Sequence, residues 1–152
     1  MDLTYKSIYI IKLEAFERKE LIKDYICKNS SLEVIRTKVC ILEKTDILNI
    51  FIDDIGTPLL VGIKKHLTGR LVEVGLVSIS PHAGISVTDE LQKVCGNHFN
   101  PMLCKKNTVR YQFGSNKCEN YDGIKYFLNA VHKASSTESQ AATKWCIENI
   151  FI

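Results

Sequence analysis

Apolar and polar positions along the chain follow two periods, one typical of strands and the other of helices. Short runs rich in β-branched and aromatic residues predict buried strands, and apolar residues recurring every three or four positions among charges predict amphipathic helices. Strands are expected at residues 5–12, 32–42, 71–79 and 126–131. Helices are expected at residues 17–28, 45–55, 58–67 and 88–95, and a last one after residue 135.

Local signals mark several ends of these elements. Thr57 with Pro58 suits an N-cap followed by proline at the first helical position, and Gly96 is typical of a helix stop. Ser135 and Glu138 have the spacing of a capping box before the last helix. Residues 97–108 show neither period and predict a long loop of functional length. Residues 114–123 are polar and turn-rich and predict an exposed insertion.

Strands separated and followed by helices predict an α+β fold. The order is compatible with a ferredoxin-like four-stranded antiparallel sheet covered by helices on one face. The chain has 152 residues, a length that one hydrophobic core commonly serves. We therefore expect a single domain over residues 1–152, with His132 at the end of the fourth strand.

Charge and cysteine usage narrow the function classes. Twenty Lys and Arg stand against 17 Asp and Glu and are spread along the chain, which argues against nucleic acid but leaves a small anionic ligand open. Six cysteines form no CxxC pair, which argues against zinc. With no signal-peptide pattern and no apolar run long enough to span a bilayer, a cytoplasmic protein without membrane contact is expected.

Four residues carry candidate chemistry: Lys12, Arg110, Asn129 and His132. Each also has an ordinary explanation. A lone histidine at a strand end is more often a satisfied polar residue than a nucleophile, and single basic residues are usually solvated or ion-paired. Only their convergence in one site would indicate chemistry.

The motif order resembles the nucleoside diphosphate kinase family over nearly the whole chain. NAVHKASSTES (129–139) is similar to the family signature Asn-x-x-His-Gly-Ser-Asp-Ser. NTVRYQFG (107–114) resembles its Thr-(Leu/Ile)-Arg segment, and an Asn-Pro pair precedes it at the family's spacing. IIK near the amino end resembles the Lys-Pro-Asp segment, and TPLLVGIKKHLTG (57–69) the nucleotide-clamping helices.

This resemblance implies transfer of the γ-phosphoryl group of a nucleoside triphosphate to a nucleoside diphosphate through a phosphohistidine on His132. Splitting one transfer into two displacements is the logic of covalent catalysis. The resemblance further implies that Lys12 and Arg110 supply positive charge and that Asn129 contacts ribose and phosphate. Mg²⁺ would accompany ATP or another nucleotide, held mainly by its phosphates rather than by a protein metal site.

Several family positions have changed in the nucleotide site. Phe51 stands where the family has a tyrosine whose hydroxyl assists the γ-phosphate, so Phe51→Tyr should raise turnover if that hydroxyl limits it. Leu59 replaces the phenylalanine that stacks on the base, Lys93 an arginine on the phosphates, and Phe99 a threonine. We still expect these four positions to bind nucleotide, with weaker stacking and less oriented charge.

The surroundings of the nucleophile have changed as well. Thr143 falls near the acidic residue that normally orients the imidazole, with Glu138 and Glu148 as the alternatives. Lys133, Ala134 and Ser135 replace Gly-Ser-Asp after the histidine. These departures leave open a catalytically weak or inactive nucleotide-binding or regulatory protein of the same fold.

Two further expectations concern the oligomeric state and the insertion. The resemblance implies homo-oligomers, a hexamer first and a dimer as the alternative, with the loop at 97–108 helping the contacts. The insertion between Gly114 and Phe127 is expected to be a solvated surface loop without a catalytic group.

Overall fold

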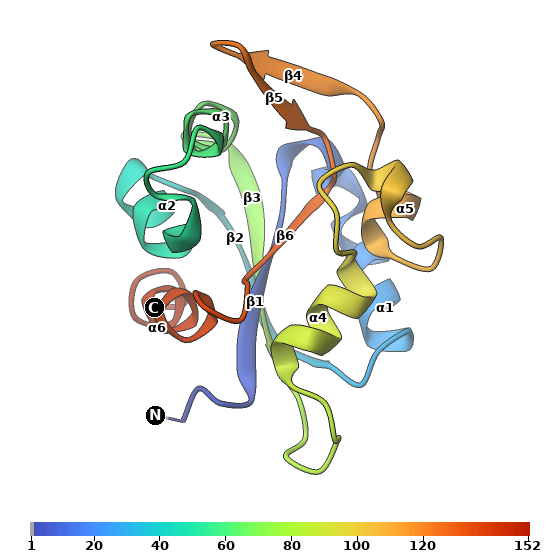
Figure 1. Ribbon diagram of the computed structural model, residues 1–152. Coiled ribbons are helices and arrows are strands. Elements are labelled where there is room, and N and C mark those ends of the chain that lie inside the picture. Colours follow the sequence, from blue (N-terminus) through green and yellow to red (C-terminus); the bar gives the residue numbers. More distant parts are fainter. Residues whose placement is uncertain (1) are drawn as a thin grey trace.

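A four-stranded sheet forms the centre of the protein, as seen in a computed structural model that describes residues 2–152 (Figure 1). Its strands lie in the order β2-β3-β1-β6, and all neighbours pair antiparallel. This is the ferredoxin-like order predicted from the sequence. The strands are β1 (Lys6–Ile11), β2 (Glu33–Ile41), β3 (Leu71–Ser78) and β6 (Val131–Lys133).

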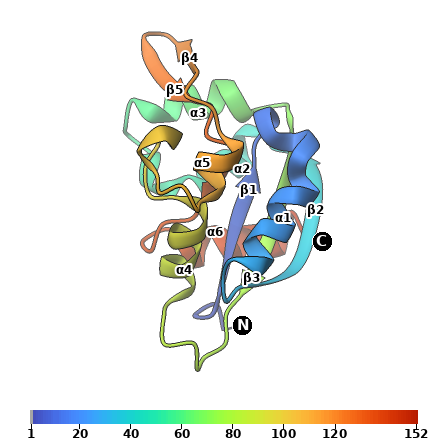
Figure 2. The ribbon, with the colours of Figure 1, turned by 90° about the vertical axis from the view of Figure 1, so that its right-hand side faces the viewer.

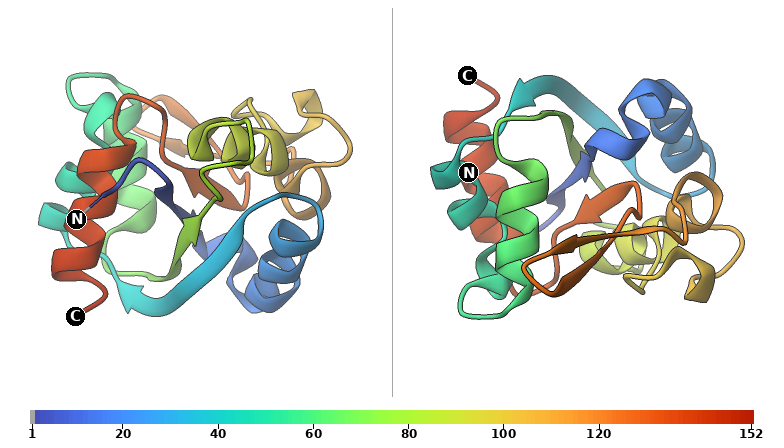
Figure 3. Two further views of the ribbon diagram at one scale, coloured as in Figure 1. Left: turned by 90° about the horizontal axis from the view of Figure 1, so that it is seen from below. Right: turned by 90° about the horizontal axis from the view of Figure 1, so that it is seen from above.

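Helices cover both faces of this sheet, so the expectation of a single covered face is wrong (Figures 1 and 3). One layer consists of α2 (Lys44–Ile50), α3 (Leu59–Leu67) and α6 (Ser139–Asn149). The other consists of α1 (Lys19–Lys28), α4 (Val87–Cys95) and α5 (Val109–Phe113).

The sequence of β1 explains the two layers. Ile8 and Ile10 belong to the core beneath α2, α3 and α6, whereas Tyr9 and Ile11 belong to the core beneath α1 and α4. All four side chains are fully buried. A strand with apolar residues on both of its faces needs helices packed against both. Its continuous apolar run therefore predicts two helix layers better than one.

Helix ends fall close to their predicted positions. Pro58 is the N-cap of α3 rather than its first residue. Ser86 caps α4 by accepting a hydrogen bond from the Asp89 amide at 3.1 Å, so this helix begins earlier than expected. Gly96 ends it at a φ of 116°, a conformation that residues with a Cβ rarely adopt. The capping pair also forms, because the Ser135 and Glu138 amides each donate to the other's side chain.

The segment after α4 differs most from its predicted structure. The expected loop at 97–108 contains one 3-10 turn, Pro101–Leu103, and is followed by the short helix α5. The predicted insertion is a hairpin of β4 (Cys118–Tyr121) and β5 (Ile124–Phe127). The fourth sheet strand is β6, so a strand over 126–131 is wrong. Ala130 breaks it with a φ of 74°, and His132 consequently lies within β6 rather than after a strand.

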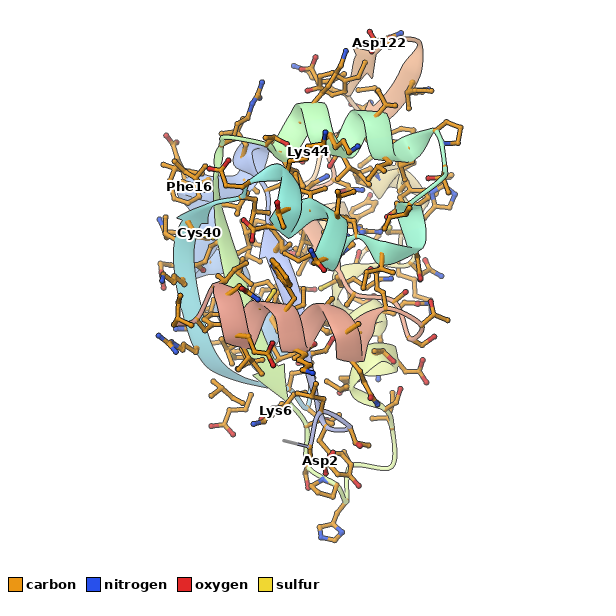
Figure 4. The ribbon with its side chains drawn as sticks, turned by 90° about the vertical axis from the view of Figure 1, so that its left-hand side faces the viewer. Asp2, Lys6, Phe16, Cys40, Lys44 and Asp122 are labelled. Carbon is orange, nitrogen blue, oxygen red and sulfur yellow. The ribbon has the colours of Figure 1, made fainter. Side chains whose placement is uncertain are left out.

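The hairpin projects from one end of the molecule beyond α3 (Figure 2). Its tip residue Asp122 lies at the opposite end from Asp2, and α6, α2 and α3 are stacked between these ends (Figure 4). Asp122 and Gly123 both have positive φ, as a tight hairpin turn requires. Tyr121 and Tyr126 of this hairpin pack into the core beneath α3, so the hairpin is not simply a solvated loop.

Candidate active site

A cavity of about 640 Å³ lies where the end of β1, β6, the end of α2, the start of α3 and the hairpin meet. This volume is in the range of pockets that enclose small ligands. All but one of the predicted site residues line it: Lys12, Phe51, Leu59, Phe99, Arg110, Asn129 and His132. Segments far apart in the sequence therefore bring the candidate chemistry to one volume.

Lys93 is the exception. It lies on α4 outside the cavity lining, its side chain is 74% exposed, and its Nζ is 4.0 Å from the Glu90 Oε1. The amphipathic helix α4 buries Val87, Leu91 and Val94, and this phase turns Lys93 to solvent. The position matched by sequence register is thus on the solvent side of the helix.

His132 is held by its strand pairing and by one neighbouring ring. It pairs with Ile10 across the β1–β6 ladder, and its ring centroid is 4.1 Å from that of Phe51. Burial, together with the positive charges of Arg110 and Lys133, lowers the pKa of His132 below its usual value near 6.5 despite the nearby Glu138. The imidazole is therefore neutral at neutral pH, the state in which a ring nitrogen has a free electron pair.

Glu138 is the carboxylate that faces His132. Its Oε1 lies 3.5 Å from His132 Nε2, and its Oε2 accepts a hydrogen bond from the Asp53 amide at 3.0 Å. A proton on Nε2 would point at this carboxylate and leave Nδ1, which makes no hydrogen bond within residues 2–152, unprotonated toward the cavity. Of the two alternatives considered for the orienting acid, Glu138 is thus in place, whereas Glu148 pairs with Lys144 at 3.9 Å.

Lys12 follows β1 and is buried at the cavity wall. Its Nζ donates to the Tyr126 hydroxyl at 3.0 Å and the Phe127 carbonyl at 3.4 Å, and lies 3.4 Å from Glu14 Oε2. Burial lowers the pKa of Lys12 to about 8, although Glu14 opposes the shift. The ammonium therefore remains mostly charged at neutral pH but close to losing its proton.

Glu14 connects Lys12 to the turn before β6. Burial alone would raise the pKa of Glu14, yet the charge of Lys12 and a hydrogen bond with His66 lower it to about 2. The same carboxylate accepts from the amide of Ala130 at 3.1 Å, and the Lys12 amide donates to the Ala130 carbonyl at 2.9 Å. These bonds hold Ala130 in its left-handed conformation and so fix the register of the strand that carries His132.

Arg110 is a buried cation with no carboxylate partner among residues 2–152. It is 6% exposed, its Nε donates to the Val131 carbonyl at 3.2 Å, and its Nη1 donates to the His98 carbonyl at 3.0 Å. No hydrogen bond from its Nη2 forms within the same residues. Because an unpaired buried charge is costly, this guanidinium indicates a place for an anion.

Asn129 offers the opposite polarity in the same cavity. Its Nδ2 donates to the Phe99 carbonyl at 3.0 Å, and its buried Oδ1 has no partner among the described residues. A buried acceptor left unsatisfied indicates a donor supplied from outside the chain. A ligand hydroxyl meets that requirement.

Apolar side chains form the outer wall. Leu59 and Ile63 come from α3, and Phe127 from the hairpin. Phe99 lines the same space but is more than half exposed. A flat apolar group such as a nucleobase could pack there through dispersion, with looser orientation than an aromatic stack.

Several further cavity residues were missed from the sequence, among them Asp54, Lys125, Tyr126 and Lys133. Lys133 was read as the loss of a glycine, yet it adds a cation whose pKa is lowered by burial and by Arg110. Burial and the charges of Glu138 and Asp53 raise the pKa of Asp54 to about 6. Only Lys133, next to the histidine in sequence, had a local signal that could have identified it.

Two further features of the protein concern metal ions and membranes. Within residues 2–152, no group of three or more His, Cys, Asp or Glu side chains is arranged to hold a metal ion. Asp53 accepts hydrogen bonds from the Ser135 and Thr137 hydroxyls, and Glu138 accepts them from the Asp53 and Ser135 amides. In this described part of the chain, no helix is both long enough and apolar enough to cross a bilayer.

Comparison with known proteins gives a likeness in structure only. No family model and no curated protein matches the sequence. Nucleoside diphosphate kinase from Aquifex aeolicus is 14% identical at a TM-score of 0.68, covering 95% of this chain and 94% of that one. The enzyme from Encephalitozoon cuniculi is 16% identical at a TM-score of 0.66, covering 94% and 87%.

A third similar structure is the nucleoside diphosphate kinase of Borrelia burgdorferi, described as a transition-state mimic with bound vanadate and ADP. It is 21% identical at a TM-score of 0.70, covering 91% of this chain and 84% of that one. These identities are too low to transfer activity, but the agreement extends over nearly the whole length. The chain therefore has the fold of the nucleoside diphosphate kinases.

Proposed function

We propose that this protein is a nucleoside diphosphate kinase, a phosphotransferase that moves the γ-phosphoryl group of a nucleoside triphosphate to a nucleoside diphosphate. The observation that carries the proposal is a neutral histidine with a free nitrogen in a cavity it shares with Arg110, a buried cation without a carboxylate partner. A nucleophile beside an unpaired positive charge suits a phosphorylated substrate.

Two displacements give the reaction. In the first, the electron pair on His132 Nδ1 forms a bond to the γ-phosphorus, the bond to the β–γ bridging oxygen breaks, and the nucleoside diphosphate leaves. In the second, a terminal oxygen of another diphosphate attacks the same phosphorus and its bond to Nδ1 breaks. Glu138 stabilises the positive charge that the ring gains in between.

The remaining site residues bind the nucleotide. Arg110 and Lys12 face the phosphate oxygens, and the unpaired Oδ1 of Asn129 accepts from a ribose hydroxyl. Leu59 and Phe99 cover the base. Mg²⁺ enters with the nucleotide, on the phosphates, and needs no ligand cluster from the chain.

The protein is proposed to act as one domain over 1–152, in the cytoplasm, as a homo-oligomer. All six cysteines are free, which suits a reducing compartment. Exposed apolar side chains in the loop at 97–108, such as Leu103, support a contact between subunits, with a hexamer expected and a dimer as the alternative.

A second candidate is a nucleotide-binding or regulatory protein of low turnover. It is favoured by one observation, that Tyr126, Glu14 and Phe127 already engage the Lys12 ammonium. The two candidates differ in whether Lys12 exchanges a partner for phosphate.

A transfer assay separates them. Purified protein is given Mg²⁺, ATP and GDP, and GTP formation is compared between wild type, His132→Ala and His82→Ala, a histidine in an exposed loop outside the cavity. The kinase requires GTP formation that His132→Ala abolishes and His82→Ala retains. Nucleotide binding without GTP formation supports the regulatory protein, and unchanged transfer by His132→Ala contradicts the phosphohistidine.

A further inference from the structure

Tyr126 places a hydroxyl from the inserted hairpin at the wall of the cavity. The residue lies on β5, is 6% exposed, and lines the same space as His132 and Arg110. Its hydroxyl accepts a hydrogen bond from Lys12 Nζ at 3.0 Å, and the same Nζ is 4.4 Å from its ring centroid. The inserted hairpin therefore contacts Lys12, the cation that the proposed function places on the phosphate oxygens.

The hydrogen of this hydroxyl is unused. A lysine ammonium only donates, so the Tyr126 oxygen is the acceptor in this bond and its own hydrogen needs another partner. No acceptor for it occurs within residues 2–152. Burial raises the pKa of Tyr126 well above 10, so the hydrogen stays on the oxygen at any pH at which the protein works.

The ring is held firmly in place. Its centroid lies 4.6 Å from that of His66, and a Cβ at Gly62 would come within 3.1 Å of the Tyr126 Cδ2. His66 is itself fixed by Glu14, whose Oε1 lies 2.8 Å from its Nε2. A donor held in this way needs no reorganisation when a ligand arrives.

No other hydroxyl on the described cavity wall is free to act. Phe51, against the His132 ring, has none, and the Ser135 hydroxyl donates to Asp53. A buried unused donor and a bound ammonium, on the wall of the cavity that also contains His132, require an oxygen acceptor from the ligand. A phosphoryl oxygen in contact with Lys12 is the acceptor that this arrangement suits.

We propose that Tyr126 donates its hydroxyl hydrogen to an oxygen of the phosphoryl group in transfer, so that Tyr126 and Lys12 act on that group together. This inference rests on the proposed function. It gives the hairpin a part in the chemistry, because the strand pairing of β4 with β5 positions the donor.

The test compares Tyr126→Phe with Tyr121→Phe. Both remove one hydroxyl from the hairpin and keep the ring, but the Tyr121 hydroxyl contacts His66 and not Lys12. The rate constant for labelling His132 with γ-labelled ATP and Mg²⁺ is measured in a single turnover. ADP affinity is measured by calorimetry, and thermal unfolding checks that both variants fold.

Tyr126→Phe is expected to slow labelling by about 10- to 150-fold, the effect of one hydrogen bond to a charged oxygen. ADP affinity should stay within about twofold of wild type, because ADP lacks the transferred group, and Tyr121→Phe should label within about twofold of wild type. An active wild type with an unchanged Tyr126→Phe rate overturns the inference alone, and an equal loss in both variants assigns the effect to hairpin packing. Absence of labelling in wild type overturns the proposed function and this inference with it.

Discussion

Glutamine in place of Glu138 tests how the His132 ring is held. The Glu138 carboxylate faces three N–H groups: His132 Nε2 at 3.5 Å, the Asp53 amide at 3.0 Å and the Ser135 amide at 3.4 Å. Glu138→Gln keeps the shape but turns one oxygen into an NH₂ group, which must face one of these donors. The substitution therefore removes the charge and leaves a donor without an acceptor.

The magnitude follows from the charge that develops on the ring. When Nδ1 bonds to phosphorus while Nε2 keeps its proton, the imidazole becomes positive and the carboxylate stabilises it. In the resting site the two groups lie 3.5 Å apart, an ion-pair distance, and Nε2 has no hydrogen-bond partner among the described residues. Once the ring is positive we expect them to close to a hydrogen bond with a charged partner, which contributes about 1.5–3 kcal/mol. Only 3% of the Glu138 side chain is exposed, so solvent screens little of this. At about 1.4 kcal/mol for each factor of ten, labelling of Glu138→Gln should be about 10- to 150-fold slower.

Single-turnover labelling with γ-labelled ATP measures this rate, and Glu148→Gln is the matched control. Glu148 has the same chemistry, but its side chain is 54% exposed and pairs with Lys144, so the control should label within about twofold of wild type. Because Glu138 raises the pKa of His132, its loss should also move the acid limb of the rate profile to lower pH. A wild-type rate with an unmoved acid limb would refute the orienting role.

The remaining predictions concern the pH profile of the reaction, the stability of the fold at Thr143, and the effect of a hydroxyl added at Phe51. The kcat/KM of wild type should fall on the acid side below pH 6.5, where His132 with its lowered pKa becomes protonated, and on the alkaline side near pH 8, where Lys12 loses its charge; a flat profile from pH 5 to 9 contradicts this. Thr143→Val should raise the free energy of unfolding by about 1 kcal/mol in urea titrations, because the buried Thr143 Oγ1 lacks a partner among the described residues, and a clear loss of stability would count against that reason. Phe51→Tyr alone should accelerate labelling by less than about twofold, since the hydroxyl of Tyr126 already donates to the phosphoryl group. Added to the Tyr126→Phe variant, the same substitution should accelerate labelling by more. A large gain from Phe51→Tyr alone would contradict the role of Tyr126.

The strongly periodic parts of the fold could be predicted from sequence. The strand at β1 and the helices α1, α3 and α4 follow from local patterns, because their apolar residues repeat at one period over several turns or pairs. The region around β5 and β6 could not. Tyr126 and Val131 are both apolar enough for one strand, and only tertiary bonds to Ala130 impose the left-handed residue that separates them.

The site was predictable where a motif fixes both residue and spacing. Arg110, Asn129 and His132 lie in such segments, and the cavity unites them with Lys12. Lys93 was chosen only because it aligns in sequence with a family arginine, which takes no account of the face of α4 on which it lies. Tyr126 was missed for a different reason, because a hairpin that folds back over α3 brings its hydroxyl to Lys12 across 114 positions of sequence.

Isolation of the phosphorylated protein tests the central claim most directly. Wild type is incubated with Mg²⁺ and γ-labelled ATP, freed of nucleotide, digested, and examined for acid-labile label on the peptide that contains His132; a second sample is chased with GDP. We predict label on His132 that passes to GDP. Stable binding of ATP with no label on the protein, or label that remains on the chain after GDP is added, would contradict transfer through this histidine.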